Sequence, residues 1–384
     1  MKRVFLNCTI SAVAFLSMST SCSKTDTGSG DIPPVDNNTY NIRVTTFAGK
    51  GGVSGLVDAK GDAARFSSPG QMVFDERNQT LYVADQGFNG LAIRAIDLEG
   101  NVSTYVGLND MFNSIGDIAL APGTAGSLYL TSPMQAAIFH IVKDPSTGKG
   151  NIDKVSGNGK GNSNGTGIAD ASFAGPKGLV TDREGNLYIG NDYFNTIRKI
   201  SFTQNKVMDF AGKPAAKALD LGGFVDGTGN ASEFNGLHDM ILSADGSFLI
   251  VPDYSNHALR KITLADRKVT TYFGDPNKGL DTDGPFGVAQ AGNPEVAVCD
   301  KNNNVYFTSF YPGVTGTKIR VAHLNDNTVR TIAGGQGTGS SRYQDGTGTE
   351  ARFNGIKGIA ITPDGKFLFV ADMYNHCVRK ISLY

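Results

Sequence analysis

The chain has 384 residues, a formal net charge of −1 and only 18% charged residues. A chain of this length can bury a core without a disulfide framework. Its near-zero charge, with no basic stripe, excludes the electrostatic footprint that nucleic-acid phosphates require, so nucleic acid is not an expected partner.

The first 22 residues have the pattern of an export signal. Lys2 and Arg3 give a positive start, and the apolar stretch 4–18 is too short to span a bilayer. Small residues then lead to Cys22, which resembles a lipoprotein signal and predicts lipidation at Cys22. Ser19 stands where such signals usually have Leu, which leaves ordinary secretion as the alternative.

Residues 23–40 are polar and predict a flexible tether. Ser23, rather than Asp, follows Cys22, which resembles outer-membrane sorting in Gram-negative bacteria. We therefore expect an outer-membrane lipoprotein of the cell envelope, facing the periplasm or the surface, that reaches the membrane through its lipid anchor.

One phrase recurs through the rest of the chain. It reads TLYVADQGFNGLAIRAI from Thr80, NLYIGNDYFNTIRKI from Asn186, FLIVPDYSNHALRKI from Phe248 and FLFVADMYNHCVRKI from Phe367. A short run that ends in Gly also recurs, starting at Val44, Val102, Val155, Val207, Val269 and Val329. Self-similarity at a long period indicates one supersecondary unit repeated many times.

The repeat predicts an all-β fold, a six-bladed β-propeller of four-stranded blades. In one copy we expect an inner strand at 178–182, a second at 187–190, a third at 196–201 and an outer strand at 207–211, because turn residues bound alternating or β-branched runs. The period of about 50–60 residues is near that of propeller blades.

The two ends of the repeat array predict how the ring closes. The array begins with an outer-strand run, 44–48, and ends after a third strand, 377–382. The N-terminal strand is therefore expected to complete the last blade, which removes exposed sheet edges. An open array with free ends is the alternative.

Two motifs resemble those of NHL-repeat β-propellers. The pattern D-x-x-N-H-x-[IVL]-R-K-I occurs at 253–262 and 372–381, and D-G-x-G-x-x-A-x-F occurs at 226–234 and 345–353. The resemblance covers residues 41–384 and implies a six-bladed ring. Similar proteins of Bacteroidetes-like, gut-type Gram-negative bacteria are often found with outer-membrane nutrient-uptake systems.

The residues that open the inner strands differ from copy to copy, and we expect them to surround one mouth of the central channel. Convergent polar groups at such a place are the default binding-site hypothesis. The candidate binding residues are Gln71, Asp117, Lys177, His238, Asp239, Glu295 and Lys357.

Acidic residues in this set could hold calcium or another divalent metal and activate water. The metal candidates are Asp117, Asp239 and Glu295, and the catalytic candidates are His238, Asp239 and Glu295. The alternative is a water-filled channel in which Lys177 and Lys357 neutralise the acids.

Aromatic residues lie near the tips of the predicted loops between second and third strands. They should share the channel-mouth face and offer stacking surfaces to sugars or anchors to a protein, unless they pack between loops. These residues are Phe88, Tyr193, Phe194, Tyr254, Phe310, Tyr311 and Tyr374. The absence of Trp weakens the sugar hypothesis.

Other recurring residues are expected to serve the blades. A recurring Asp or Asn ends most second strands and should hydrogen-bond nearby backbone amides. His257 and His376 also recur and are expected to be structural.

The favoured function is a non-enzymatic binding module for a glycan, a peptide or an envelope protein. The alternative is a metal-dependent hydrolase, lactonase or lyase that uses the channel mouth, and a structural role in an envelope complex is a third hypothesis. A strongly acidic mouth would favour an enzyme, whereas lysines that bridge the acids would count against it.

Overall fold

The computed structural model describes residues 42–384 except 89, 109–111, 113, 145, 148–149, 311–316 and 336–341. The predicted export signal, Cys22, the tether and Tyr311 lie outside the described residues. Within the described ranges, no helix has the length and apolar character needed to cross a membrane.

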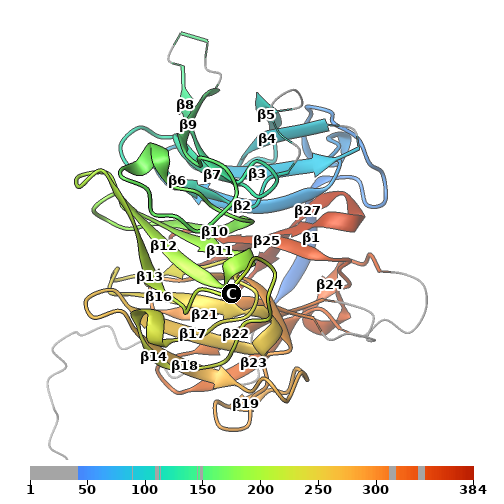
Figure 1. Cartoon of the computed structure of the whole chain (residues 1–384). Coiled ribbons are helices and arrows are strands. Elements are labelled where there is room, and N and C mark those ends of the chain that lie inside the picture. The colour runs from blue at the N-terminus through green and yellow to red at the C-terminus, as the bar shows by residue number, and fades with distance from the viewer. Residues whose placement is uncertain are drawn as a thin grey trace, which may run out of the picture. The chain divides into compact units, whose positions relative to one another are not determined.

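Six antiparallel sheets form a ring, which confirms the predicted six-bladed β-propeller (Figure 1). Blade 1 consists of β2 (Pro69–Asp75), β3 (Thr80–Gly87), β4 (Gly90–Asp97) and β5 (Val102–Gly107). Blade 2 consists of β6 (Ile118–Leu120), β7 (Leu128–Ser132), β8 (Ala137–Lys143) and β9 (Gly150–Ser156). Blade 3 consists of β10 (Pro176–Thr181), β11 (Leu187–Asn191), β12 (Thr196–Ser201) and β13 (Lys206–Ala211).

The last three blades each carry one extra short strand on their outer edge. Blade 4 consists of β15 (Ile241–Leu242), β16 (Phe248–Asp253), β17 (Ala258–Thr263), β18 (Lys268–Gly274) and β14 (Gly227–Thr228). Blade 5 consists of β20 (Asn293–Cys299), β21 (Asn304–Phe310), β22 (Lys318–His323), β23 (Thr328–Ala333) and β19 (Gly284–Pro285). Blade 6 consists of β25 (Ile356–Ile361), β26 (Phe367–Asp372), β27 (Cys377–Ser382), β1 (Arg43–Gly49) and β24 (Gly346–Thr347).

Short 3₁₀ turns interrupt the loops. Four lie between blades, at η1 (Gly61–Ala63), η2 (Ile168–Asp170), η4 (Gly229–Ala231) and η6 (Gly348–Glu350). Three connect second to third strands, at η3 (Asp192–Phe194), η5 (Tyr254–Asn256) and η7 (Met373–Asn375). The predicted strands agree with these bounds, except that Val155 lies near the end of β9 and not at its start.

The N-terminal strand closes the ring as predicted. β1 pairs antiparallel with β27, from Arg43 opposite Ser382 to Gly49 opposite Cys377, and the two strands lie side by side in Figure 1. β1 therefore supplies the outer strand that the C-terminal end of the array lacks, and the last blade has no open third-strand edge.

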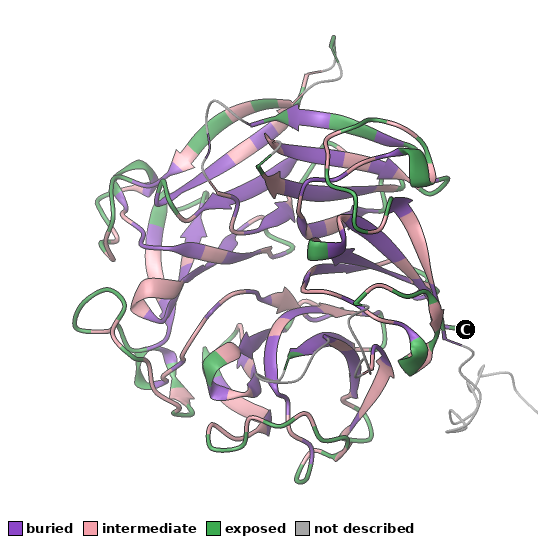
Figure 2. Ribbon diagram, turned by 90° about the vertical axis from the view of Figure 1, so that its right-hand side faces the viewer, coloured by how far each residue is buried: buried purple, intermediate pink, exposed green. Residues whose placement is uncertain are grey.

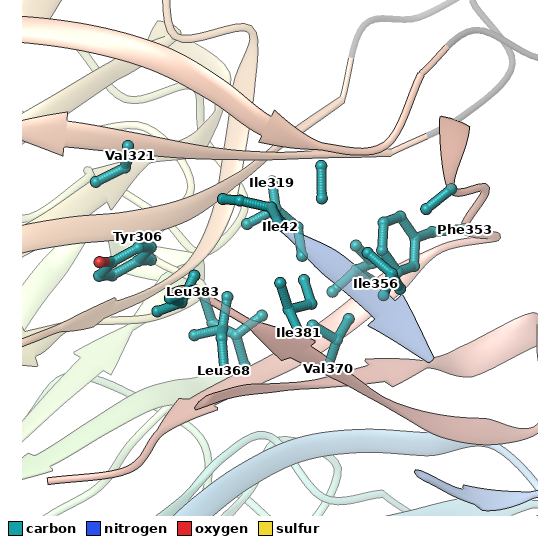
Figure 3. Close-up of a cluster of buried hydrophobic side chains, with 14 of the residues drawn as sticks. Ile42, Tyr306, Ile319, Val321, Phe353, Ile356, Leu368, Val370, Ile381 and Leu383 are labelled. Carbon is teal, nitrogen blue, oxygen red and sulfur yellow. The ribbon is translucent and has the colours of Figure 1, made fainter. Parts of the chain in front are cut away.

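Burial follows the strands, and exposure concentrates in the loops (Figure 2). The core cluster in Figure 3 contains Ile42 and Val44 from the N-terminal end, Ile319 from blade 5, and Val370 and Ile381 from blade 6. The N-terminal segment is thus part of the core between two blades. Such burial contributes about 1.5–3 kcal/mol for each large aliphatic side chain.

A buried guanidinium ties the loops to the blade in five of the six copies. The five arginines are completely buried: Arg94, Arg198, Arg260, Arg320 and Arg379. In blade 4, Arg260 forms ion pairs with Asp253 at 2.7 Å and with Asp226 at 2.8 Å. Asp253 also accepts a hydrogen bond from the amide of Asn235 at 2.8 Å, which fixes the loop that precedes the inner strand.

Blade 2 replaces this ion pair with apolar packing. Phe139 occupies the arginine position of β8 and makes an edge-to-face contact with Phe112, with ring centroids 4.6 Å apart. Ser132 stands where blades 1, 4 and 6 have the carboxylates of Asp85, Asp253 and Asp372. Blade 2 lacks both the arginine and the carboxylate, so no buried charge is left without a partner. A buried ion pair can be replaced as a unit by apolar residues, whereas loss of one partner leaves an unpaired buried charge.

The ring-closing strand gives a direct stability test. A chain that starts at Gly49 lacks the buried Ile42 and Val44 side chains and the β1–β27 hydrogen bonds, so we expect it to lose at least about 3 kcal/mol of unfolding free energy relative to a chain that starts at Asn41. Chemical denaturation followed by circular dichroism measures the difference. Equal midpoints for the two chains would contradict closure by β1.

Candidate functional site

The inner strands of all six blades surround one central channel. A cavity of about 300 Å³ lies in it, with at least one lining residue from each inner strand or the residue that opens it. Its wall is mostly aliphatic, as with Leu179 and Met240, and it also includes Gln71, Asp117 and Asp239 from the predicted mouth set. The inner strands begin at the face where second and third strands are joined, so this face carries the predicted mouth.

Five side chains from four blades lie close together at this mouth, as two ion pairs with a histidine between them, here called the polar arc: Lys177, Asp192, His238, Glu295 and Lys357. Lys177 Nζ lies 2.9 Å from Asp192 Oδ2. His238 lies between two acids, with Nε2 4.0 Å from Asp192 Oδ2 and Nδ1 3.8 Å from Glu295 Oε1. Lys357 forms an ion pair with the same Glu295 oxygen.

The polar arc is electrically balanced. It contains two ammonium groups and two carboxylates, each ammonium is paired with one carboxylate, and His238 is the remaining member. Burial lowers the pKa of His238, and the positive charge of Lys177 lowers it further, while Asp192 and Glu295 oppose the shift. Because its pKa lies below the ordinary value of 6.5, His238 is mainly neutral at pH 7.

An aromatic ring extends the arc. Tyr254 stacks on His238, with ring centroids 4.7 Å apart and planes inclined by 27°. Burial raises the pKa of the Tyr254 hydroxyl, so it remains a neutral hydrogen-bonding group at pH 7. His238 and Tyr254 together make a stacked pair of rings at the mouth.

The other loop tyrosines occupy a different position in the repeat. Tyr193 and Tyr374 are one residue further from the end of the second strand than Tyr254 is. Their rings lie against Gly175 and Gly355, where a Cβ atom would come within 2.6 and 2.5 Å of them, and both glycines have positive φ. The alternative of packing onto a loop thus applies to these two rings.

The remaining predicted loop aromatics differ in exposure. Phe88 is fully exposed, Phe310 is exposed, and Phe194 is half-buried. Tyr374 still exposes 56% of its surface despite its contact with Gly355. Phe88, Phe194 and Tyr374 lie in connections between second and third strands and Phe310 ends β21, so all four lie at the mouth face but outside the charged groups of the arc.

Asp117 and Asp239 hydrogen-bond to neighbouring blades, and Asp239 also lies within the electrostatic influence of Glu295 in the arc. Asp117 accepts hydrogen bonds from its own following amide, Ile118, and from Leu179 of blade 3, both at 2.7 Å. Asp239 accepts from Met240 at 2.7 Å and from Ala297 of blade 5 at 2.8 Å. Each carboxylate therefore links two inner strands.

The structure does not bring the three predicted metal ligands together. Asp117 and Asp239 each use both carboxylate oxygens on backbone amides, and Glu295 is paired with Lys357. Across the described residues, no three His, Cys, Asp or Glu side chains are grouped so that they could hold a metal ion. The catalytic candidates separate likewise, because His238 and Glu295 belong to the arc whereas Asp239 does not.

Asp192 is the member of the polar arc that the sequence analysis did not name. It occupies the first position after the second strand, where other copies have Tyr254 and Met373. Its Oδ1 accepts a hydrogen bond from the Leu237 amide at 2.9 Å, which aims Oδ2 at Lys177 and His238. The residue type at this position differs between the copies, and this difference is the sequence feature that could have identified Asp192 as a candidate.

The recurring histidines are structural in their contacts. His257 and His376 both adopt left-handed backbone conformations at the end of a 3₁₀ turn. His257 Nδ1 lies 2.9 Å from the Gly292 carbonyl oxygen in the loop that leads to the next blade, and His376 Nδ1 lies 2.6 Å from that of Ser67. They therefore link successive blades beside the mouth.

Comparisons with known proteins support the fold more than the activity. No family model matches the chain. The chloroplastic protein SUPPRESSOR OF QUENCHING 1 of Arabidopsis thaliana is 26% identical over 283 residues, which is 67% of this chain but only 26% of that protein. The chain thus spans about a quarter of the length of this curated relative.

Solved structures with similar folds include proteins described as binders and as enzymes. An auxiliary nutrient binding protein from Bacteroides thetaiotaomicron has a TM-score of 0.67 at 18% identity, over 90% of this chain and 77% of that one. A gluconolactonase from Xanthomonas campestris has a TM-score of 0.53 at 12% identity, over 89% of this chain and 90% of that one. At these identities the similarity shows a shared propeller fold.

The buried Asp239 should leave a measurable pH signature. Burial raises its pKa in the folded protein to about 6, from 3.8, so the folded state holds the proton more tightly than the unfolded chain does. Its contribution to the unfolding free energy should therefore fall by roughly 2–3 kcal/mol as the pH rises from about 4 to about 7.

Urea denaturation of the wild type and Asp239→Asn across this pH range tests the point. The stability advantage of the wild type over the variant should shrink as the pH rises, because the variant lacks the titrating carboxyl group. Parallel pH profiles for the two proteins would contradict the assignment.

Proposed function

We propose that this protein is an envelope-anchored lipoprotein whose propeller acts as a non-enzymatic binding module. The ligand is a glycan, a peptide or a partner protein, and it is received at the channel mouth. The observation that carries the proposal is the polar arc, in which polar side chains from four blades converge on one place. A few convergent polar groups are what fixes the orientation of a ligand in a binding pocket.

The pairing of the arc favours binding over hydrolysis. A general base or a metal-bound water needs a carboxylate that is available to the reaction. Glu295 is held by Lys357, and Asp192 is held by Lys177. Among the predicted acids, Glu295 is thus paired with a lysine, which supports a binding role, while the remaining N–H groups of the lysines stay available to a ligand.

Similar propellers add support of a general kind. Auxiliary nutrient binding proteins from two Bacteroides species share the fold, at 18% and 17% identity. A binding role agrees with those descriptions and with the sequence-based expectation of an exported protein.

The direction of β1 shows at which face the described chain enters the propeller. Arg43, at the start of β1, lies opposite Ser382, at the end of β27, whereas Gly49 lies opposite Cys377 beside the mouth face. The chain therefore enters the propeller at the face opposite the mouth. A lipid anchor at Cys22 would therefore be joined to the propeller through this face and not through the mouth.

The binding site is tested by one substitution and a control in the same blade. Lys357→Ala removes an ammonium group from the arc, whereas Lys366→Ala removes one from the turn between β25 and β26 at the opposite face. Ligands found on glycan and peptide arrays should bind Lys357→Ala at least about tenfold more weakly, since a hydrogen bond to a charged group contributes about 1.5–3 kcal/mol. Isothermal titration calorimetry measures the change.

Binding to the Lys366→Ala protein should match that of the wild type. If Lys357→Ala leaves the affinity of every array ligand unchanged, the mouth is not the binding site.

The anchor is tested in cells. Cys22→Ala removes the thiol that a lipid would modify, so the variant should leave the membrane fraction and appear in the soluble fraction. Ultracentrifugation and immunoblotting measure the distribution, with Cys299→Ala as the control that keeps Cys22. Continued membrane association of the Cys22→Ala protein would refute lipidation at this residue.

A further inference from the structure

The charge balance of the polar arc restricts which ligand the mouth can accept. A charged ligand gains affinity from an uncompensated opposite charge in its site. Each ammonium of the arc already has its carboxylate, with Lys177 on Asp192 and Lys357 on Glu295. An anionic or cationic ligand would have to compete with one of these internal ion pairs.

The same pairs leave many hydrogen-bonding positions free. Each ammonium has three donors and each carboxylate has about four acceptor positions, so a single ion pair does not exhaust either group. The side chains remain partly accessible, with exposed fractions of 30% for Lys177, 37% for Lys357 and 20% for Glu295. Donors and acceptors are thus available side by side along the arc.

A stacked pair of rings lies among these polar groups, and the ring faces that point away from each other are the ones a ligand could meet. His238 stacks on Tyr254 and stands between Asp192 and Glu295. An aromatic face packs against the C–H groups of a ligand ring while neighbouring polar groups bind its edge. A ligand that suits both features has a ring-shaped body and groups that donate and accept at once.

Hydroxyl groups are the chemical groups that both donate and accept without carrying charge. From the geometry of the mouth we infer that its ligand is a neutral glycan, an uncharged and polyhydroxylated sugar, and not an acidic glycan or a peptide with charged ends. This inference rests on the proposed binding function and specifies the ligand class for the same site.

The test uses the full propeller and defined probes. Calorimetric titrations with maltotriose, mannotriose and xylotriose represent neutral glycans, trigalacturonate represents acidic glycans, and an alanine dipeptide represents charged peptides. The wild type should bind at least one neutral trisaccharide more tightly than trigalacturonate or the dipeptide. Tighter binding of either charged probe, or binding of no neutral trisaccharide at millimolar concentration, would overturn the inference.

A substitution then changes the charge balance without changing the shape of the side chain. Glu295→Gln leaves Lys357 without its counter-charge, so trigalacturonate should bind this variant about fivefold more tightly than it binds the wild type, the gain expected from releasing one partly exposed ion pair. Glu76→Gln makes the same charge change in the turn between β2 and β3 at the opposite face and should not alter trigalacturonate binding.

Restoring neutrality provides the matching control. The double variant Glu295→Gln/Lys357→Met should lose the affinity for trigalacturonate that Glu295→Gln gains. Unchanged trigalacturonate binding in Glu295→Gln would contradict charge balance as the basis of selectivity. If a charged probe binds the wild type and weakens with Lys357→Ala, the mouth remains the binding site and only the ligand class is wrong. If no mouth substitution affects a bound probe, both proposals fail.

Discussion

The buried pairing of a guanidinium with carboxylates is the interaction on which the mouth depends. In blade 4, Arg260 on the third strand contacts Asp253 at the end of the second strand, Asp226 in the preceding loop, and the backbone oxygens of Val225 and Glu233. One side chain therefore fixes the loop that delivers the chain to the inner strand. Because a charge without solvent contact must be satisfied, this arrangement tolerates little displacement.

The residues that recur build the frame, and those that differ between copies make the site. Asp85, Asp253 and Asp372 repeat because blades 1, 4 and 6 share the same pairing of this carboxylate with the buried arginine. At the next position along the chain blade 4 has Tyr254 and blade 3 has Asp192, since this position takes no part in the pairing with the buried arginine. That freedom lets blade 3 supply a carboxylate and blade 4 a ring to the same mouth.

The sequence was sufficient to predict the blades and the ring closure, because period, turn residues and the missing last strand are local features. The hydrogen-bond partners of Asp117 and Asp239 could not be predicted from such local features. Both carboxylates turn to amides of the neighbouring blade, at Leu179 and Ala297, and that depends on how closely adjacent inner strands approach. The role of Asp192 likewise depends on a contact between blades 3 and 4.

The most direct test of the account is the pKa of His238. This residue lies between the charged groups of the arc, so its pKa depends on the positive and negative charges around it. It can be measured by NMR titration, with the His238→Gln protein used to assign its signal among the five histidines. We predict a pKa below 6.5 in the wild type, a lower value in Asp192→Asn and a higher value in Lys357→Met. A value at or above 6.5 that neither substitution shifts would contradict a compensated polar arc.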